Sequence, residues 1–292
     1  MITNPFLEHA LLAGTFIAIA CGLVGWFAVL RAQVFAADAL SHFAFTGAIV
    51  GLALGLDARL GLFVFTIGCA LLLAALGGRS RVDDLTIGIA ITWVLGLGVL
   101  ALAFFATSSA GSGGASAAIA LFGSILGLDA PHADLAAVIG IGISVVMLVI
   151  ARPLLFSSID PAAARARGVP VVLLGVLFLV ALGGVAAEAT QAVGALLLLG
   201  LVAAPAGAAH RLTNHPYRGM VLSAAIGVVS VWVGLWIANT FPNIPPGSAI
   251  IAVASAAFFC AGAPAAMGRA VRRLHLGAPA ADATATPDID RA

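Results

Sequence analysis

The sequence contains few charged residues and no lysine at all. Only 9% of its 292 residues are Asp, Glu, Lys or Arg, and every basic residue among them is arginine. Soluble domains typically carry about 25% charged residues. Hydrophobic residues make up 62% of the chain, and the mean hydropathy is +1.17. So little charge cannot cover so much apolar surface in water, so the composition predicts a polytopic membrane protein.

Several catalytic and cofactor-binding motifs are also absent. The chain has no GxxxxGK[ST] phosphate loop, so we do not expect it to bind ATP in that way. It has no HExxH or GxSxG motif, so no intramembrane hydrolase is recognisable. Cys21, Cys69 and Cys260 each stand alone in an apolar run, which is typical of small buried side chains. We therefore predict neither an enzyme nor a permanently bound cofactor.

Apolar runs of spanning length recur along the chain and predict an all-α bundle of about nine transmembrane helices. Each run is close to the ~20 residues that cross a bilayer. The break at "VAAEATQAVG" is very short, so eight spans remain an alternative if one run is re-entrant. Glycines inside the runs favour close contact between helices. The predicted spans are 11–30, 38–56, 60–77, 85–106, 133–151, 169–187, 192–211, 219–240 and 248–267.

The arginines indicate the orientation of these spans, because cytoplasmic loops are enriched in positive charge. With nine spans and an outer N-terminus, the outer loops contain a single arginine, Arg59. The inner loops and the tail then contain Arg31, Arg79, Arg81, Arg152, Arg165, Arg167, Arg211, Arg218, Arg269, Arg272, Arg273 and Arg291. We therefore predict an N-out, C-in topology.

Two segments are not expected to cross the membrane. The piece at 117–128 is apolar and helix-like but too short to span, which favours a re-entrant or interfacial position. Residues 269–292 end in a low-complexity sequence that predicts a disordered cytoplasmic tail. The membrane domain would then comprise residues 1–268.

Asp38 and His42 are the unusual residues of the second predicted span. They are four residues apart, so a helix places them on one face, one turn from each other. A carboxylate inside a membrane is costly unless it is paired or faces water, which makes it a candidate functional group. A structural Asp–His hydrogen bond between helices is the alternative. Together the two side chains suit zinc or manganese but cannot fill a coordination shell, which a two-fold dimer could complete.

Two further segments have recognisable local chemistry. In "SSIDPAAARARGVPV", Asp160 can cap a short helix, Pro161 can occupy its first position and Gly168 can end it. Such a helix on the arginine-rich side could dock a soluble partner or could be an ordinary connector. Pro205 is expected to kink or break the seventh run, which could serve gating or packing.

In this order, the motifs resemble those of the permease subunit of bacterial metal-ion ABC importers, the zinc, manganese and iron group called ABC-3. "ADALSHFAFTGAIVG" is similar to the family's GDxLSHxxLPGxxxG, and "SIDPAAARARGV" to its SxDPxxAxxxGV. Two departures are Ala37, where the family has Gly, and Thr46, where it has Pro. The other similar stretches are "VDDLTIGIAITWVLGLGV", "QAVGALLLLGLVAAPAGAAHRL" and "NIPPGSAIIAVASAAFF".

The resemblance implies a fold related to type II ABC importer permeases, in the bacterial cytoplasmic membrane. It also implies a second permease copy, two cytoplasmic ATP-binding subunits and an extracytoplasmic metal-binding protein, with no nucleic acid partner. ATP would bind only to the partner subunits. The family's metal pathway maps onto Asp38 and His42. Its ATPase-coupling segment maps onto 157–168, with Ser158, Asp160, Pro161, Ala164, Arg167 and Gly168.

Several alternatives stay open at this point. Zinc, manganese and ferrous iron all suit an aspartate with a histidine. A permease for metal chelates, siderophores or cobalamin would share the coupling segment but would not need the Asp38–His42 pair. An intramembrane enzyme is a third possibility, but the sequence contains no second catalytic constellation. A membrane scaffold is a fourth, but a scaffold would not need a buried Asp–His pair.

Overall fold

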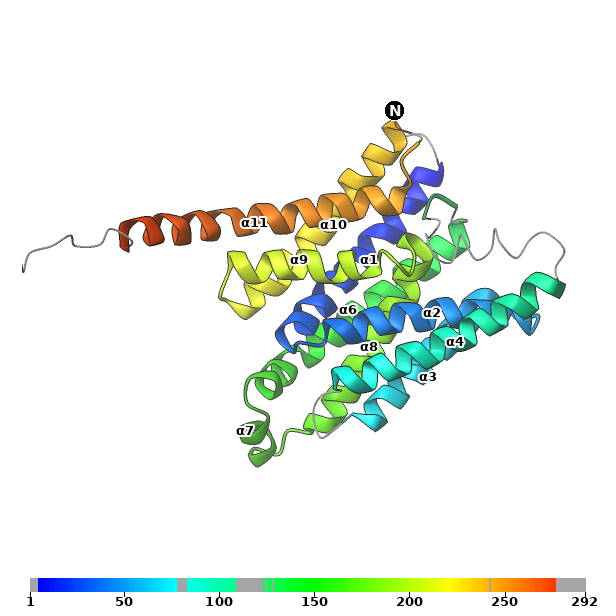
Figure 1. Cartoon of the computed structure of the whole chain (residues 1–292), viewed down its shortest axis with the longest axis horizontal. Helices are drawn as coiled ribbons and strands as arrows, with labels where there is room; N and C mark the ends of the chain where they lie inside the picture. The colour runs from blue at the N-terminus through cyan, green and yellow to red at the C-terminus, as the bar shows by residue number, and fades with distance from the viewer. Residues whose placement is uncertain are drawn as a thin grey trace, which may run out of the picture.

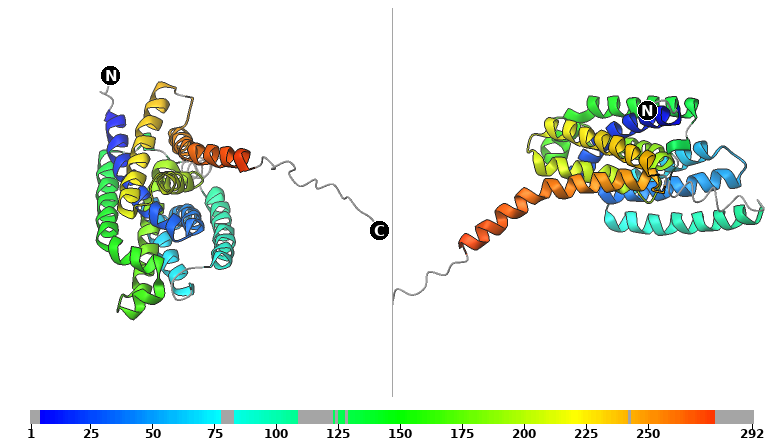
Figure 2. Two further views of the ribbon diagram at one scale, coloured as in Figure 1. Left: turned by 90° about the vertical axis from the view of Figure 1, so that its left-hand side faces the viewer. Right: turned by 90° about the horizontal axis from the view of Figure 1, so that it is seen from above.

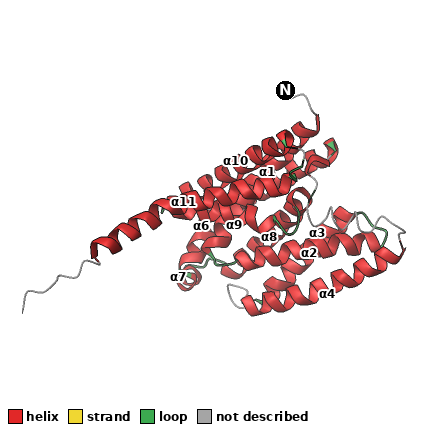
Figure 3. Cartoon of the chain, turned by 45° about the horizontal axis from the view of Figure 1, so that its top comes forward, coloured by secondary structure: helices red, strands yellow, loops and turns green. Residues whose placement is uncertain are grey.

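The structure is a computed structural model that describes residues 5–77, 83–108, 123, 125–127, 129–241 and 243–276. Its described part contains helices and connecting loops but no strand (Figure 3). The elements are α1 (Pro5–Leu30), α2 (Val34–Ala53), α3 (Ala58–Leu76), α4 (Asp84–Ser108), the 3₁₀ turn η1 (Ile125–Gly127), α6 (Ala130–Ile159), α7 (Pro161–Ala166), α8 (Val171–Val193), α9 (Leu198–Leu212), α10 (Pro216–Thr240) and α11 (Pro246–Leu276).

The predicted helical membrane bundle is confirmed, because each of the nine apolar runs corresponds to one helix. Among the described residues, seven helices have the length and apolar composition to cross a bilayer: α1, α2, α3, α4, α6, α8 and α10. The apolar helix α9 has 15 residues, which is shorter than the ~20 residues of a perpendicular span. α11 has 31 residues, and its described apolar part includes Pro246–Gly262.

The helices pack in two neighbouring groups that meet at α8. In one group α1 contacts α6, α9 and α10, while α11 contacts α9 and α10 (Figures 1 and 2). In the other, α2 contacts α3 and α4 (Figure 1). α8 contacts α3 and α2 on one side and α6 and α1 on the other. α1, α2 and α8 are mostly buried, whereas α3 and α4 are mostly exposed, as expected for helices at a surface facing lipid or a partner.

Glycines bring α2 and α3 into backbone contact. A Cβ atom built on Gly61 would lie 2.6 Å from the Gly47 carbonyl oxygen and 2.7 Å from the Gly51 Cα. Side chains at these positions would therefore force the helices apart. This contact is the close helix approach that the glycine-rich runs predict.

The break between the sixth and seventh predicted spans lies later in the chain than expected. α8 continues through the polar stretch to Val193, and the break begins at Gly194, whose φ of 101° favours glycine. The polar stretch stays helical partly because the Glu188 carboxylate is buried against an arginine and needs no water.

Other expectations concern the less regular segments. α11 continues to Leu276, so residues 269–276, predicted to begin a disordered tail, are helical. Of the piece at 117–128, the structure describes only Gly123 and η1. Residues 277–292, together with Arg79 and Arg81, lie outside the described residues.

Candidate cation pathway and coupling segment

Asp38 and His42 lie on one face of α2. The helix begins at Val34, which places Asp38 about 6 Å and His42 about 12 Å along it at 1.5 Å per residue. The His42 Nε2 and Asp38 Oδ2 atoms are 4.0 Å apart. At that separation the two side chains are close but do not share a hydrogen bond.

These two residues form the open face of an otherwise buried helix. All the remaining residues of α2 between Ala36 and Ile49 are buried. The side chains of Asp38 and His42 are 32% and 20% exposed, and neither has a hydrogen-bond partner in the described part of the chain. The alternative of a structural Asp–His bond between helices therefore has no counterpart here. One carboxylate and one imidazole point to the open side of the helix together.

The two departures from the family motif lie on the buried side of the same helix. Ala37 is fully buried. Thr46 is also buried, and its hydroxyl donates to the Val94 carbonyl of α4 over 3.3 Å. α2 is continuous through both positions. Thr46 thus ties α2 to α4, while the face with Asp38 and His42 stays open.

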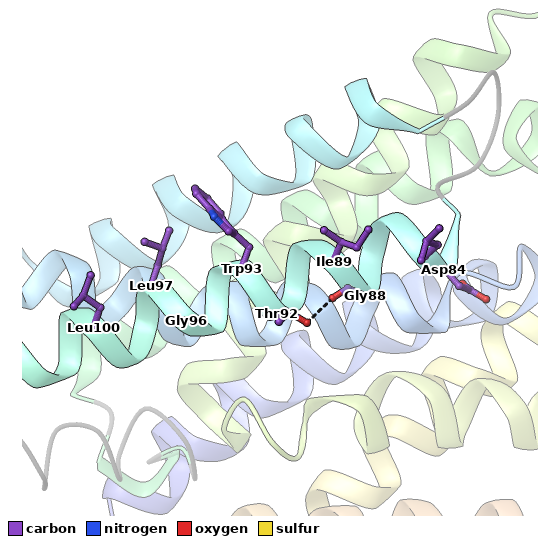
Figure 4. Close-up of a pocket in the computed structure, with 9 residues that line it drawn as sticks. Asp84, Gly88, Ile89, Thr92, Trp93, Gly96, Leu97 and Leu100 are labelled. Atoms are coloured by element: carbon purple, nitrogen blue, oxygen red, sulfur yellow. Dashed lines mark hydrogen bonds between the residues drawn. The ribbon is translucent and has the colours of Figure 1, made fainter.

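A hollow of the described structure lies elsewhere, on the outer face of α4 (Figure 4). It is an open groove of about 800 Å³ lined by that helix alone, and Gly88 and Gly96 leave it room. The Thr92 hydroxyl donates to the Gly88 carbonyl over 3.0 Å, and Trp93 stands beside it. The groove is mostly apolar and suits a lipid chain or another helix better than a cation.

The described residues contain no group of three or more His, Cys, Asp or Glu side chains placed to hold a metal ion. A single chain therefore presents only two candidate ligands at Asp38 and His42, fewer than the four or more that zinc or manganese takes. As the sequence suggests, any complete shell needs further ligands from water or a second copy.

The coupling segment has the local structure that its sequence predicts. The Asp160 carboxylate accepts hydrogen bonds from the backbone N–H groups of Ala162 and Ala163, at 3.0 and 2.9 Å. Pro161 is the first helical residue of α7, and Gly168 has a φ of +79° just past its end. The helix lies at one end of the molecule, beyond the other helices (Figure 1).

The segment exposes one side and buries the other. Asp160, Arg167 and Gly168 are exposed, so they are available to a partner. Ala164 is fully buried and packs α7 against its own chain, so it cannot touch a partner directly. Ser158 is also buried, and its hydroxyl donates to the Leu154 carbonyl over 2.6 Å.

Arg31 was expected only as a charge in an inner loop, but it is buried and in contact with the coupling segment. The side chain is 2% exposed. Its Nη1 donates to the Ser158 hydroxyl over 3.1 Å and its Nε to the Gln33 side-chain oxygen over 3.0 Å. The guanidinium carbon lies 5.3 Å from the centre of the Phe178 ring of α8. No local sequence pattern indicates these contacts, because Ser158 is 127 residues away.

Pro205 does not break its helix. α9 is assigned as one helix from Leu198 to Leu212 with Pro205 buried inside it. The interruption of regular helix lies at Gly194–Leu197. The expected break is therefore supplied by a glycine with positive φ, several residues before the proline.

Comparison with known proteins gives concordant matches. The model of the ABC 3 transport family matches residues 3–264. The manganese transport system membrane protein MntC of Halalkalibacterium halodurans is 31% identical over 261 residues, covering 88% of this chain and 87% of the relative. The manganese import system permease protein ScaB of Streptococcus parasanguinis is 32% identical over 257 residues, covering 87% and 88%.

Solved structures share the fold. A chain of PsaBC from Streptococcus pneumoniae, in complex with Fab, is similar with a TM-score of 0.77 and 29% identity, covering 89% of this chain and 92% of that one. A putative metal-chelate type ABC transporter in an inward-facing conformation is similar with a TM-score of 0.60 and 16% identity, covering 86% and 84%. At that identity the second likeness concerns the fold alone.

Proposed function

Since this chain belongs to the ABC 3 transport family, we propose that it is the permease through which an ATP-driven importer carries manganese into the cell. The observation that carries this proposal is that the side chains of Asp38 and His42 lie 4.0 Å apart, without a hydrogen-bond partner among the described residues, on the open face of α2. A carboxylate oxygen and an imidazole nitrogen suit manganese, zinc or ferrous iron. The relatives named for manganese transport favour manganese among the three.

A two-fold dimer would complete the site. Each copy contributes the same Asp38 and His42, so a symmetry axis near this face would gather two carboxylates and two imidazoles. Such a four-ligand set can hold a divalent cation with one or two waters. The cation is cargo, so the site has to release it as well as bind it.

The coupling segment would convert ATP hydrolysis into movement. We place α7 in a groove of a cytoplasmic ATP-binding subunit, one subunit for each permease copy. The exposed Asp160, Arg167 and Gly168 would lie at that contact. Hydrolysis on the ATP-binding subunits would then reorient the spans, while Pro205 is a candidate for the gate in α9. This chain itself performs no catalysis in the scheme.

The same scheme implies a membrane location and an orientation for the protein. An extracytoplasmic binding protein would deliver the cation to the outer face of the dimer, in the bacterial cytoplasmic membrane. The predicted N-out, C-in topology would put α7 on the cytoplasmic side, with the ATP-binding subunits. Lipid would surround the bundle, and zinc and ferrous iron are the alternative cargoes.

The test is uptake of manganese by proteoliposomes that hold the permease, its ATP-binding subunits and the binding protein. Asp38→Asn and His42→Gln keep the size of each side chain but weaken it as a ligand. We expect each to lower uptake at least ~100-fold with the complex still assembled. Asp84→Asn, on the exposed face of α4, is the matched control and should transport normally.

Metal analysis of the vesicle lumen, with zinc and ferrous iron offered in competition, identifies the preferred cargo. Normal manganese uptake by the Asp38→Asn/His42→Gln double variant would overturn the proposed pathway. Uptake of a metal chelate, with no uptake of the free cation, would favour the permease class for siderophores or cobalamin.

A further inference from the structure

The connection between α1 and α2 is short and tightly shaped around Arg31. It comprises only residues 31–33, and Ala32 has a φ of +53°, the only positive φ of a non-glycine residue in the described structure. That conformation is unfavourable for an L-residue by roughly 1–2 kcal/mol. Backbone bonds from Arg31 to Phe27 and from Gln33 to Ala28 hold the turn. The fold therefore maintains this turn at a cost.

The Arg31 side chain contacts two helices and the residue that precedes a third. Its hydrogen bond to Ser158 reaches the last turn of α6, and its contact with the Phe178 ring reaches α8. Its bond to Gln33 reaches the residue that immediately precedes α2. α6 and α8 are the two helices that flank α7 along the chain and contact it. The guanidinium thus lies between the coupling segment and the start of the helix that carries Asp38.

The path through these contacts is short. Ser158 is two residues before Asp160, whose carboxylate caps α7. On the other side, Gln33 is five residues before Asp38, about 7.5 Å along a helix. Hydrogen bonds to a charged group inside a protein are stronger and more directional than those in water. We therefore expect these hydrogen bonds to transmit a displacement of α7 to α2.

We propose that Arg31 is a positioning residue that transmits movement of the coupling segment to α2 and so sets the geometry of the Asp38–His42 face. The proposal rests on the function proposed above and adds a route to it. Arg31 touches neither the cation nor ATP. Its planar guanidinium serves Ser158 and Gln33 simultaneously while lying over the Phe178 ring, which a lysine cannot do.

The experiment compares Arg31→Lys and Ser158→Ala with the wild type in proteoliposomes that contain the whole importer. Both uptake of manganese and hydrolysis of ATP are measured. We expect the Arg31→Lys variant to assemble and to hydrolyse ATP at near the wild-type basal rate. The number of cations moved per ATP should fall roughly tenfold, the effect of losing one charge-assisted hydrogen bond. A merely structural role would lower both rates together and leave their ratio unchanged.

Arg211→Met is the matched control. Arg211 is an arginine at the same end of the bundle, in the last turn of α9, and it donates to the Phe258 carbonyl over 3.2 Å. It touches neither α2 nor the coupling segment in the contacts described, so the ratio should stay at the wild-type value. The proposal would be overturned if the number of cations moved per ATP fell equally in this control, or if it stayed normal in Ser158→Ala.

A second measurement needs no metal and separates this proposal from the function it rests on. A fluorophore is attached at Phe35→Cys, an exposed position in the first turn of α2, with Cys260→Ser to avoid the exposed native thiol. Addition of ATP to the assembled complex should change the fluorescence in the otherwise wild-type chain. Ser158→Ala should remove most of that change, and its full persistence would count against the link. Failure of the wild type to move manganese would refute only the proposed cargo.

Discussion

Arg59, at the start of α3, and Glu188, in the last part of α8, form an ion pair with 2.7 Å between Nη2 and Oε1. The two side chains are 12% and 3% exposed. Arg59 also donates to the His132 carbonyl in the first turn of α6, over 3.5 Å. One arginine therefore joins the group of helices that holds Asp38 and His42 to the group around α1.

Loss of either charge of this pair should destabilise the protein. Arg59→Met leaves the Glu188 carboxylate buried without its cation, which costs about 3 kcal/mol. The thermal midpoint of the purified permease should fall by several degrees. The double variant Arg59→Met/Glu188→Gln removes both charges and should recover most of the loss. Arg152→Met, at an exposed arginine of α6, is the control. Equal midpoints for the single and double variants would show that the pair is not coupled.

The cap of α7 should govern docking of the ATP-binding subunit. Asp160→Ala removes both hydrogen bonds to the first turn, which costs about 1 kcal/mol of helix stability. The affinity of the permease for its ATP-binding subunit should drop roughly fivefold, as measured by titration in detergent. Asp160→Asn keeps a capping oxygen and should bind much more tightly than the alanine variant. Equal affinities of the two variants would show that docking depends on the carboxylate charge and not on the capping hydrogen bonds.

The glycine contact between α2 and α3 predicts a position-specific effect of one methyl group. In Gly61→Ala the added Cβ would overlap backbone atoms of Gly47 and Gly51, which cannot move without shifting α2. We expect a loss of about 2 kcal/mol of stability and a matching loss of uptake. Gly68→Ala lies seven residues along the same helix, where a Cβ meets no atom within 4 Å, and should behave like the wild type. Thermal unfolding and uptake of the two variants, compared side by side, provide the measurement.

Local features of the structure followed directly from the sequence. Hydropathy placed the long helices, because a membrane helix satisfies its own backbone hydrogen bonds and needs only an apolar run. Asp160, Pro161 and Gly168 predicted the start and end of α7, since capping bonds join residues two or three positions apart. Helical periodicity alone put Asp38 and His42 on one face. These interactions all fall within about one turn of helix.

Tertiary structure decided the features that depend on distant partners. Glu188 and Arg59 are 129 residues apart, and Arg31 and Ser158 are 127 apart, so neither partner can be read from the other's surroundings. The partner of Glu188 keeps a polar stretch helical and buried, while the contacts of Arg31 turn a loop arginine into part of the interior. The physical reason is desolvation. A charge can enter the interior of a bundle only where the packing of other helices supplies its hydrogen bonds, and that packing is a property of the whole fold.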